Sequence, residues 1–180
     1  YWVWYYDVDL YEKYDMNPPE TWTEFLNQAE FFNEKGINVI GNTVGQSRWT
    51  SFIIFQELLL HKDHEFYKKL MAGEAHWTDK EVVETMELWK SLLDKGYFAP
   101  MDSTYVQDYP RMFKNDKLAF APMGTWYSGI LMDRGLQPGK DYNVFVLPAI
   151  SEEGKGALAT EISPLMVGKK SDNKEKAKKW

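Results

Sequence analysis

One stretch in the second half of the chain decides the fold class: Leu118-Ala119-Phe120-Ala121-Pro122-Met123-Gly124-Thr125-Trp126-Tyr127. The apolar run at 118–123 predicts a buried strand, and Gly124-Thr125 turns from it into a short helix. The same order occurs earlier, with a short buried strand at 37–40, a polar loop at 41–47 and an amphipathic helix from near 49 to 60. Because strands alternate with helices, the sequence predicts an α/β fold with at least partly parallel strand pairing.

The remaining elements continue this alternation on both sides of the two units. We expect a strand at 1–6, short helices at 7–14 and 109–114, a strand at 142–147 stopped by Pro148, and a strand region at 158–167 broken by Pro164. Thr21-Trp22-Thr23-Glu24 matches a capping box at a helix start, and Gly36 ends that helix. The spacing recurs at Thr78-Asp79-Lys80-Glu81, before a helix that carries an apolar face of Val82, Val83, Met86, Trp89, Leu92 and Leu93.

Composition excludes several classes of function. The formal net charge of −6 repels phosphate backbones, so we expect no nucleic-acid partner. No apolar run approaches the roughly eighteen residues of a membrane span, and cysteine is absent. His61 and His64 have a spacing that could hold a metal but lack a third ligand, and Asp7-Val8-Asp9 resembles the opening of a calcium loop without its glycine and terminal Glu. We therefore expect no metal and no cofactor.

The aromatic residues, 8 Trp and 11 Tyr among them, point either to a core of large residues or to a surface that stacks flat ligands. Trp49 follows the polar loop beside Gln46 and Arg48, and Trp126 follows the apolar strand. Both lie at loop-to-helix junctions beyond strand ends, where open α/β sheets bind ligands. A core role is the alternative for each, and helical spacing places Trp22 and Trp89 in the core.

Carboxylates require an enzyme to be considered, because a glycoside hydrolase needs two of them facing each other across a sugar. Glu57, Glu81, Glu84 and Glu87 fall on predicted helix surfaces, where exposed ion pairing explains them. Glu161 differs, because it lies in a small and apolar stretch where a charge requires a partner or a ligand. One such carboxylate indicates binding, so the candidate ligand-binding residues are Gln46, Arg48, Trp49, Trp126 and Glu161, with no catalytic residue.

Ordered motifs along the whole chain resemble those of the family 1 extracellular solute-binding proteins, the relatives of maltose-binding protein. These motifs are Tyr5-Tyr6-Asp7-Val8-Asp9-Leu10, the stretch from Pro18 to Phe25, the helix from Glu81 to Gly96, the stretch from Phe113 to Phe120, Gly124-Thr125-Trp126, and Ser171-Asp172-Asn173. Two positions depart from the family pattern. Asp7 replaces the usual Asn, and Asp116 replaces the usual Gly.

The resemblance implies a periplasmic-binding-protein-like (type II) venus-flytrap fold, with one lobe and part of the second in this chain. Residues 1–147 would form most of the C-terminal lobe, with hinge strands near 3–7 and 143–149, and residues 148–180 would return toward the other lobe. Because the chain starts within a strand and ends within a helix, we expect the N-terminal lobe and the C-terminal end to be missing. We therefore expect this segment alone to bind sugar poorly.

The function that the resemblance implies is capture of a sugar or oligosaccharide for an ABC importer, without catalysis. Its partners would be the sugar and the permease subunits, and a lipid anchor outside this segment would be its only link to a membrane. We expect a monomer at the extracellular face of the membrane or in the periplasm. A glycoside hydrolase and a carbohydrate-interaction module are the alternatives. Paired inward carboxylates would favour the first, and a flat exposed aromatic patch without a cleft would favour the second.

Overall fold

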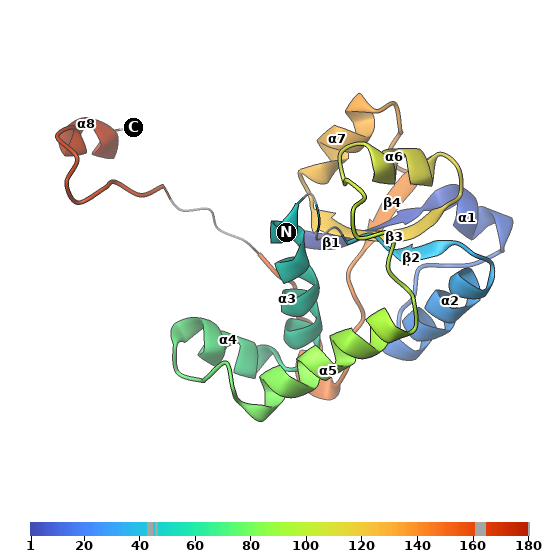
Figure 1. Ribbon diagram of the computed structural model, residues 1–180, viewed down its shortest axis with the longest axis horizontal. Coiled ribbons are helices and arrows are strands. Elements are labelled where there is room, and N and C mark those ends of the chain that lie inside the picture. The colour runs from blue at the N-terminus through green and yellow to red at the C-terminus, as the bar shows by residue number, and fades with distance from the viewer. Residues whose placement is uncertain (43–44, 46, 161–164, 180) are drawn as a thin grey trace.

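The computed structural model describes residues 1–42, 45, 47–160 and 165–179 of the chain (Figure 1). Four strands form one mixed sheet in the order β2-β3-β1-β4, with bounds Asn38–Ile40, Leu118–Gly124, Trp2–Asp7 and Tyr142–Phe145. β2 and β3 are parallel, while β1 is antiparallel to both β3 and β4. The fold class is α/β as predicted, with one parallel strand pair in the sheet.

Helices cover both faces of the sheet (Figure 1). Their bounds are α1 Val8–Lys13, α2 Trp22–Glu34, α3 Ser51–Lys62, α4 His64–Ala72, α5 Lys80–Asp94, α6 Asp108–Phe113, α7 Tyr127–Asp133 and α8 Lys174–Lys178, and short 3₁₀ turns occupy Arg48–Thr50 (η1) and Glu152–Gly154 (η2). Side chains alternate along β1. Val3 and Tyr5 pack in the cluster with α6 and α7, whereas Trp4 packs in the cluster with α2 and α5.

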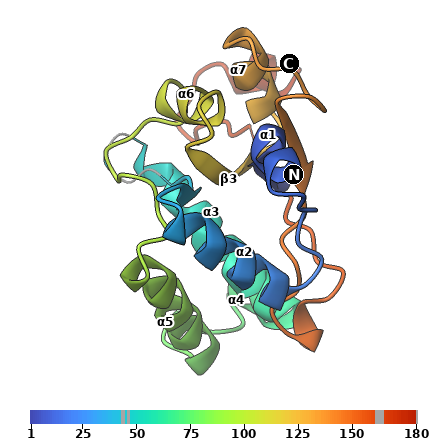
Figure 2. The ribbon, with the colours of Figure 1, turned by 90° about the vertical axis from the view of Figure 1, so that its right-hand side faces the viewer.

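The longer helices form as their sequences predict. Thr21 caps α2, with its hydroxyl accepting from the Glu24 N–H and the Glu24 carboxylate accepting from the Thr21 N–H. α5 runs beside α3, where Lys62 and Glu84 form an ion pair at 2.6 Å (Figure 2). In the described part of the chain, none of the helices combines the length and apolar character that crossing a bilayer requires.

Two predictions of local structure are wrong, and one helix was missed. The second capping box does not form, because α5 starts at Lys80 and the Asp79 carboxylate accepts from the His76 N–H instead of capping the helix. The described residues of 158–167 form no strand, because their backbone pairing with β1 is confined to one hydrogen bond from the Trp2 N–H to the Ala159 carbonyl at 3.0 Å, and Leu165 is 84% exposed. α4 was not expected, although Asp63 caps it by accepting from the Phe66 N–H.

The apolar stripe of α5 is wider than the surface that covers it. Val82 and Leu92 are buried and Trp89 is partly buried, but Val83, Met86 and Leu93 are 47%, 48% and 37% exposed. Only one side of the predicted face therefore belongs to the core of the described chain.

Candidate functional site

Three aromatic rings from distant parts of the sequence meet at the C-terminal end of β3. Trp49 lies in η1, Tyr105 in the loop before α6, and Trp126 between β3 and α7. Their ring centroids are 5.6 Å (Trp49–Tyr105), 5.8 Å (Trp49–Trp126) and 6.0 Å (Tyr105–Trp126) apart. Trp49 is 38% and Trp126 47% exposed. These three residues, called the aromatic platform below, present apolar ring surface to solvent.

Gly124 and Tyr5 position the Trp126 indole. A Cβ at Gly124 would lie only 2.2 Å from Nε1 of Trp126, so the indole lies against a strand end that only glycine leaves free. The Tyr5 hydroxyl donates to the Thr125 carbonyl at 3.1 Å and accepts from the Ser128 N–H at 3.1 Å. The turn that carries Trp126 is therefore fixed to the buried strand β1.

The Trp49 side of the platform is supported by hydrogen bonds and by packing. Both the N–H and the hydroxyl of Thr50 donate to the Ser47 carbonyl, at 3.0 and 2.9 Å, and the Asn42 amide donates to the Thr50 carbonyl at 3.1 Å. The Trp49 ring also lies 6.2 Å from the Phe52 ring in the first turn of α3. These contacts hold η1 at the rim of the sheet.

Tyr105 is a platform residue that the sequence analysis missed. The Tyr127 hydroxyl donates to the Tyr105 carbonyl at 2.6 Å, and the Asp108 carboxylate accepts from the N–H and the hydroxyl of Thr104, at 2.7 and 2.9 Å. The hydrogen bond from the Thr104 N–H holds the pKa of Asp108 below its ordinary value. The available signal was positional, since Tyr105 also lies in a polar loop just before a helix.

The structure brings together only part of the predicted ligand-binding set. Trp49 and Trp126 are neighbours, and Arg48 is exposed in the same turn as Trp49. Gln46 and Glu161 lie outside the described residues. Trp22 and Trp89 pack against the core cluster, as expected. The binding role of each candidate stays a prediction.

One carboxylate expected on a helix surface is buried. Glu57 is 1% exposed, accepts from the indole N–H of Trp4 at 3.2 Å, and lies 3.7 Å from His61. The interpretation of Glu57 as an exposed, ion-pairing residue is therefore wrong, because α3 is buried on several sides. Glu84 does form ion pairs, one with the partly buried Lys62 and one with the exposed Lys80. The imidazoles of His61 and His64 have different partners, since His64 contacts Glu65 and the Glu153 carbonyl.

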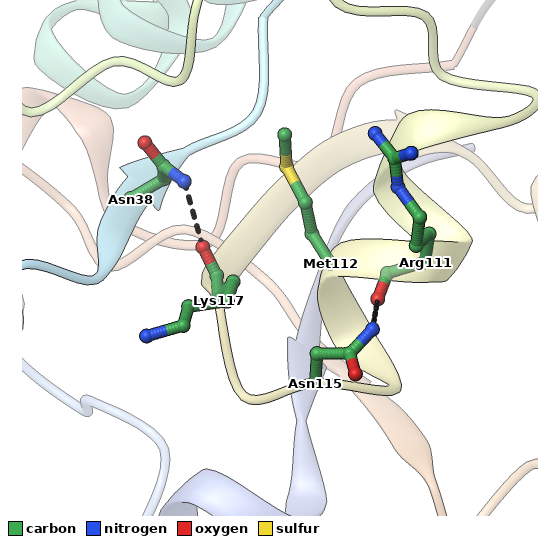
Figure 3. Close-up of a pocket in the computed structure, with 5 residues that line it drawn as sticks. All are labelled: Asn38, Arg111, Met112, Asn115 and Lys117. Carbon is green, nitrogen blue, oxygen red and sulfur yellow. Dashed lines mark hydrogen bonds between the residues drawn. The ribbon is translucent and has the colours of Figure 1, made fainter.

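Among the hollows in the described part of the chain, two that lie outside the platform are alternative candidate sites. A small apolar pocket of about 150 Å³ lies between α3 and α4, lined by Phe52, Phe55, Gln56, Tyr67, Met71 and Trp77. A hollow of about 390 Å³ lies beside the starts of β2 and β3, lined by Asn38, Arg111, Met112, Asn115 and Lys117 (Figure 3).

Three polar side chains of the larger hollow, those of Asn38, Asn115 and Arg111, already have partners within the chain. The Asn38 amide donates to the Lys117 carbonyl at 2.9 Å, and the Asn115 amide donates to the Arg111 carbonyl at 2.6 Å (Figure 3). The Arg111 guanidinium pairs with Asp108 at 2.7 Å. Because these side chains are already paired, the exposed rings of the platform are the better candidate for a ligand-binding site.

Comparison with known proteins decides the family. The model of the family described as "Bacterial extracellular solute-binding protein" matches residues 1–180, the whole chain. The chain belongs to this family. Solute-binding proteins of this kind are transport-associated binding proteins of ABC transporters, and the chain carries the family's motifs from end to end.

Two curated relatives of this solute-binding protein are similar in sequence. An uncharacterized ABC transporter extracellular-binding protein of Pyrococcus horikoshii is 28% identical, over 93% of this chain and 44% of that protein. A probable sugar-binding periplasmic protein of Rhizobium meliloti is 27% identical, over 78% of this chain and 34% of that protein. The chain thus spans less than half the length of the curated relatives it matches.

Solved structures share the fold of this solute-binding protein. A sugar transporter from Bacillus licheniformis in complex with stachyose superposes with a TM-score of 0.70 at 19% identity, over 99% of this chain and 48% of that one. A chitin oligosaccharide binding protein superposes with a TM-score of 0.71 at 19% identity, over 86% of this chain and 39% of that one. The mixed sheet with its flanking helices is therefore the fold of the periplasmic-binding-protein-like solute receptors.

Proposed function

We propose that the full-length protein captures a sugar or oligosaccharide for an ABC importer, and that the aromatic platform of Trp49, Tyr105 and Trp126 stacks on the ligand. The exposed platform is the observation that carries this proposal. A sugar ring presents an apolar C–H face, and an indole covers that face with few rotamers to lose. Arg48, which is exposed beside Trp49, is available to hydrogen-bond sugar hydroxyls. Gln46 and Glu161 are retained as ligand contacts on sequence grounds alone.

The proposal includes closure of a second lobe over the platform. β1 and β4 pair antiparallel, with Trp4 opposite Phe145 and Asp7 opposite Tyr142, so the two proposed hinge segments near 3–7 and 143–149 run side by side. Adjacent strands that both cross between lobes can bend together, which is how hinge closure encloses a ligand. The closed form would then dock on the permease at the extracellular face of the membrane or in the periplasm, as a monomer with or without a lipid anchor.

We further propose that the protein binds without catalysis. The platform consists of aromatic rings, and Glu57 points into the core toward Trp4 and His61. A glycoside hydrolase would need two carboxyl groups facing across the sugar. The names of similar proteins support a sugar as the ligand: a probable sugar-binding periplasmic protein, a sugar transporter in complex with stachyose and a chitin oligosaccharide binding protein.

The test is calorimetry on the full-length protein against a panel of mono- and oligosaccharides, followed by Trp126→Ala with the best ligand. Loss of a buried aromatic anchor typically costs on the order of 2 kcal/mol, so we expect affinity to fall at least tenfold, or about 1.4 kcal/mol. The melting temperature without sugar should hardly change, because the indole is 47% exposed. Trp77→Ala is the matched control, since Trp77 is 61% exposed outside the platform.

If Trp126→Ala melts much earlier yet binds normally, Trp126 is a core residue and the site is wrong. Hydrolysis of any sugar in the panel would overturn the proposal of binding without catalysis.

A further inference from the structure

Three carboxylates meet at the end of β1 that lies away from the aromatic platform. Asp7 ends β1, Asp9 lies in the first turn of α1, and Asp116 lies in the turn between α6 and β3. One carboxylate oxygen of each lies within 4.8 Å of the others. These three residues, called the carboxylate cluster below, come from segments more than one hundred residues apart. A cation bound by the cluster would join β1 and α1 to the turn before β3.

Asp7 shows that the cluster requires a further partner. The side chain is completely buried, and one of its oxygens, Oδ1, accepts from the Leu10 N–H at 3.2 Å. The other oxygen, Oδ2, has no hydrogen-bond partner among the described residues. A buried carboxylate with an unsatisfied oxygen is costly unless it gains a proton or a cation. Burial, with the nearby Asp116 and Asp9 carboxylates, raises the pKa of Asp7 to about 8.

Lys13 supplies one positive charge, but to a different carboxylate. Its Nζ lies 2.8 Å from Oδ2 of Asp116, and the Lys13 side chain is about half exposed. The cluster has three carboxyl groups, and this lysine pairs with one of them. The Asp7 oxygen without a partner is the position where an additional cation would gain most.

We propose that the carboxylate cluster of Asp7, Asp9 and Asp116 binds a Ca²⁺ ion. Ca²⁺ takes oxygen ligands at about 2.3–2.6 Å, so ligands on opposite sides of the ion lie about 4.6–5.2 Å apart, which accommodates the span of the cluster. Mg²⁺ requires near-ideal octahedral geometry and dehydrates reluctantly, so it usually takes one or two carboxylates and keeps several waters, and a cluster of three carboxylates suits it less. Water completes the coordination on the solvent side, where Asp9 is exposed.

The role of the ion follows from its place in the fold. It links the start of α1 to the turn before β3, at the end of the sheet opposite the platform. Binding to the folded form alone stabilises that form in proportion to the logarithm of the ion concentration. The ion therefore acts on stability, and sugar affinity should change less than about twofold between Ca²⁺ and a chelator. The proposal stands independently of which sugar is bound.

The test is titration of the full-length protein, stripped with EGTA, with CaCl₂ and in parallel with MgCl₂. Calorimetry should show a Ca²⁺ site with a dissociation constant on the order of 10⁻³ M or tighter, as in extracellular modules. Asp7→Asn and Asp116→Asn should each weaken it at least tenfold, while Asp133→Asn, an exposed carboxylate on α7, should not. Asn at position 7 keeps a capping oxygen for α1, and Asn tolerates the left-handed conformation of Asp116 (φ 53°), so both variants should fold.

Lys13 separates the proposal from its main competitor, in which Lys13 alone neutralises the cluster. Lys13→Met should tighten Ca²⁺ binding severalfold, because it removes a competing cation from Asp116. In EGTA, Asp7→Asn should melt at or above the temperature of the wild type, since it removes a buried carboxyl group whose charged form is disfavoured by burial. The proposal is overturned if Ca²⁺ at about 5 mM neither binds nor raises the melting temperature, or if Asp7→Asn binds Ca²⁺ as the wild type does. A Lys13→Met variant without Ca²⁺ affinity would overturn it equally.

Discussion

The phenol oxygen of Tyr5 lies 3.1 Å from the backbone nitrogen of Ser128 and accepts its N–H. The same hydroxyl donates to the Thr125 carbonyl at 3.1 Å, so one buried group joins the centre of β1 to the turn that presents Trp126. Because β1 is also a proposed hinge strand, the link connects the strand that would bend on closure to the platform that would meet the ligand.

Tyr5→Phe should therefore loosen the platform while the fold survives. A typical hydrogen bond contributes about 1 kcal/mol, so we expect a comparable loss in the free energy of unfolding and a several-fold weaker sugar affinity. Tyr11→Phe is the control, because the Tyr11 hydroxyl donates to Gln28 at 2.6 Å, away from the platform. Denaturant unfolding and calorimetry on both variants check this. Equal loss of sugar affinity in the two variants would show that Tyr5 has no special link to the site.

Asp108 gives the stability of the Tyr105 loop a defined pH dependence. Two hydrogen bonds from Thr104 hold the pKa of Asp108 below its ordinary value, and the bond from the Thr104 N–H has the larger effect. The folded state thus binds fewer protons than the unfolded state in this window, and the contribution is fully present above the ordinary Asp pKa of about 3.9. It is lost as the pH falls through the lower pKa of the folded state.

We expect Asp108→Asn to lower the free energy of unfolding at pH 6 by on the order of 1 kcal/mol. This loss is at or below the usual contribution of a hydrogen bond to a charged group. The difference from the wild type should shrink as the pH falls below about 4. Urea unfolding of the two proteins between pH 6 and pH 3 measures it, with Asp102→Asn as the control. A difference that stays constant over this range would remove Asp108 ionisation as its cause.

The fold was predictable from sequence because its units are local. Apolar runs such as 118–123 and the capping box at Thr21 act over a few residues, and both form as expected. Strand pairing was less accessible, since the antiparallel position of β1 between β3 and β4 depends on contacts across more than one hundred residues. The burial of Glu57 could not be predicted from the local sequence either, because helical spacing does not show how many other elements pack around α3.

The candidate site could be predicted only in part, for a similar reason. The rule that ligands bind beyond the C-terminal ends of strands selected Trp49 and Trp126, and the two rings are neighbours. Tyr105 came from a loop with no periodic signal. Asp7 and Asp116 were noted as two separate departures from the family pattern, and only the folded chain places them in one cluster.

The capping-box sequences at Thr21 and Thr78 share a pattern, but only the one at Thr21 caps a helix, so the two threonines can be compared directly by mutation. Thr21→Ala should destabilise the protein by about 1 kcal/mol, because the Thr21 hydroxyl accepts from the Glu24 N–H at 3.1 Å. Thr78→Ala should change the stability by less than about 0.5 kcal/mol, the usual range for a surface position, since α5 starts at Lys80 without a side-chain cap. Thermal or urea unfolding decides, and equal losses would mean that Thr78 caps α5 after all.

Gly124→Ala tests whether the place of the Trp126 indole, and not only its presence, matters for binding. An alanine Cβ would lie 2.2 Å from Nε1 of Trp126, so the indole must move. The displaced atom belongs to a side chain at the surface, so the fold should survive while sugar affinity falls at least severalfold and the tryptophan fluorescence shifts.

Gly129→Ala in α7 is the matched control, because its Cβ would meet nothing within 4 Å and alanine favours a helix by up to about 1 kcal/mol. It should bind sugar normally and melt no earlier than the wild type. If Gly124→Ala also binds normally, the ligand does not depend on the platform geometry described here, and the stacking role of Trp126 fails with it.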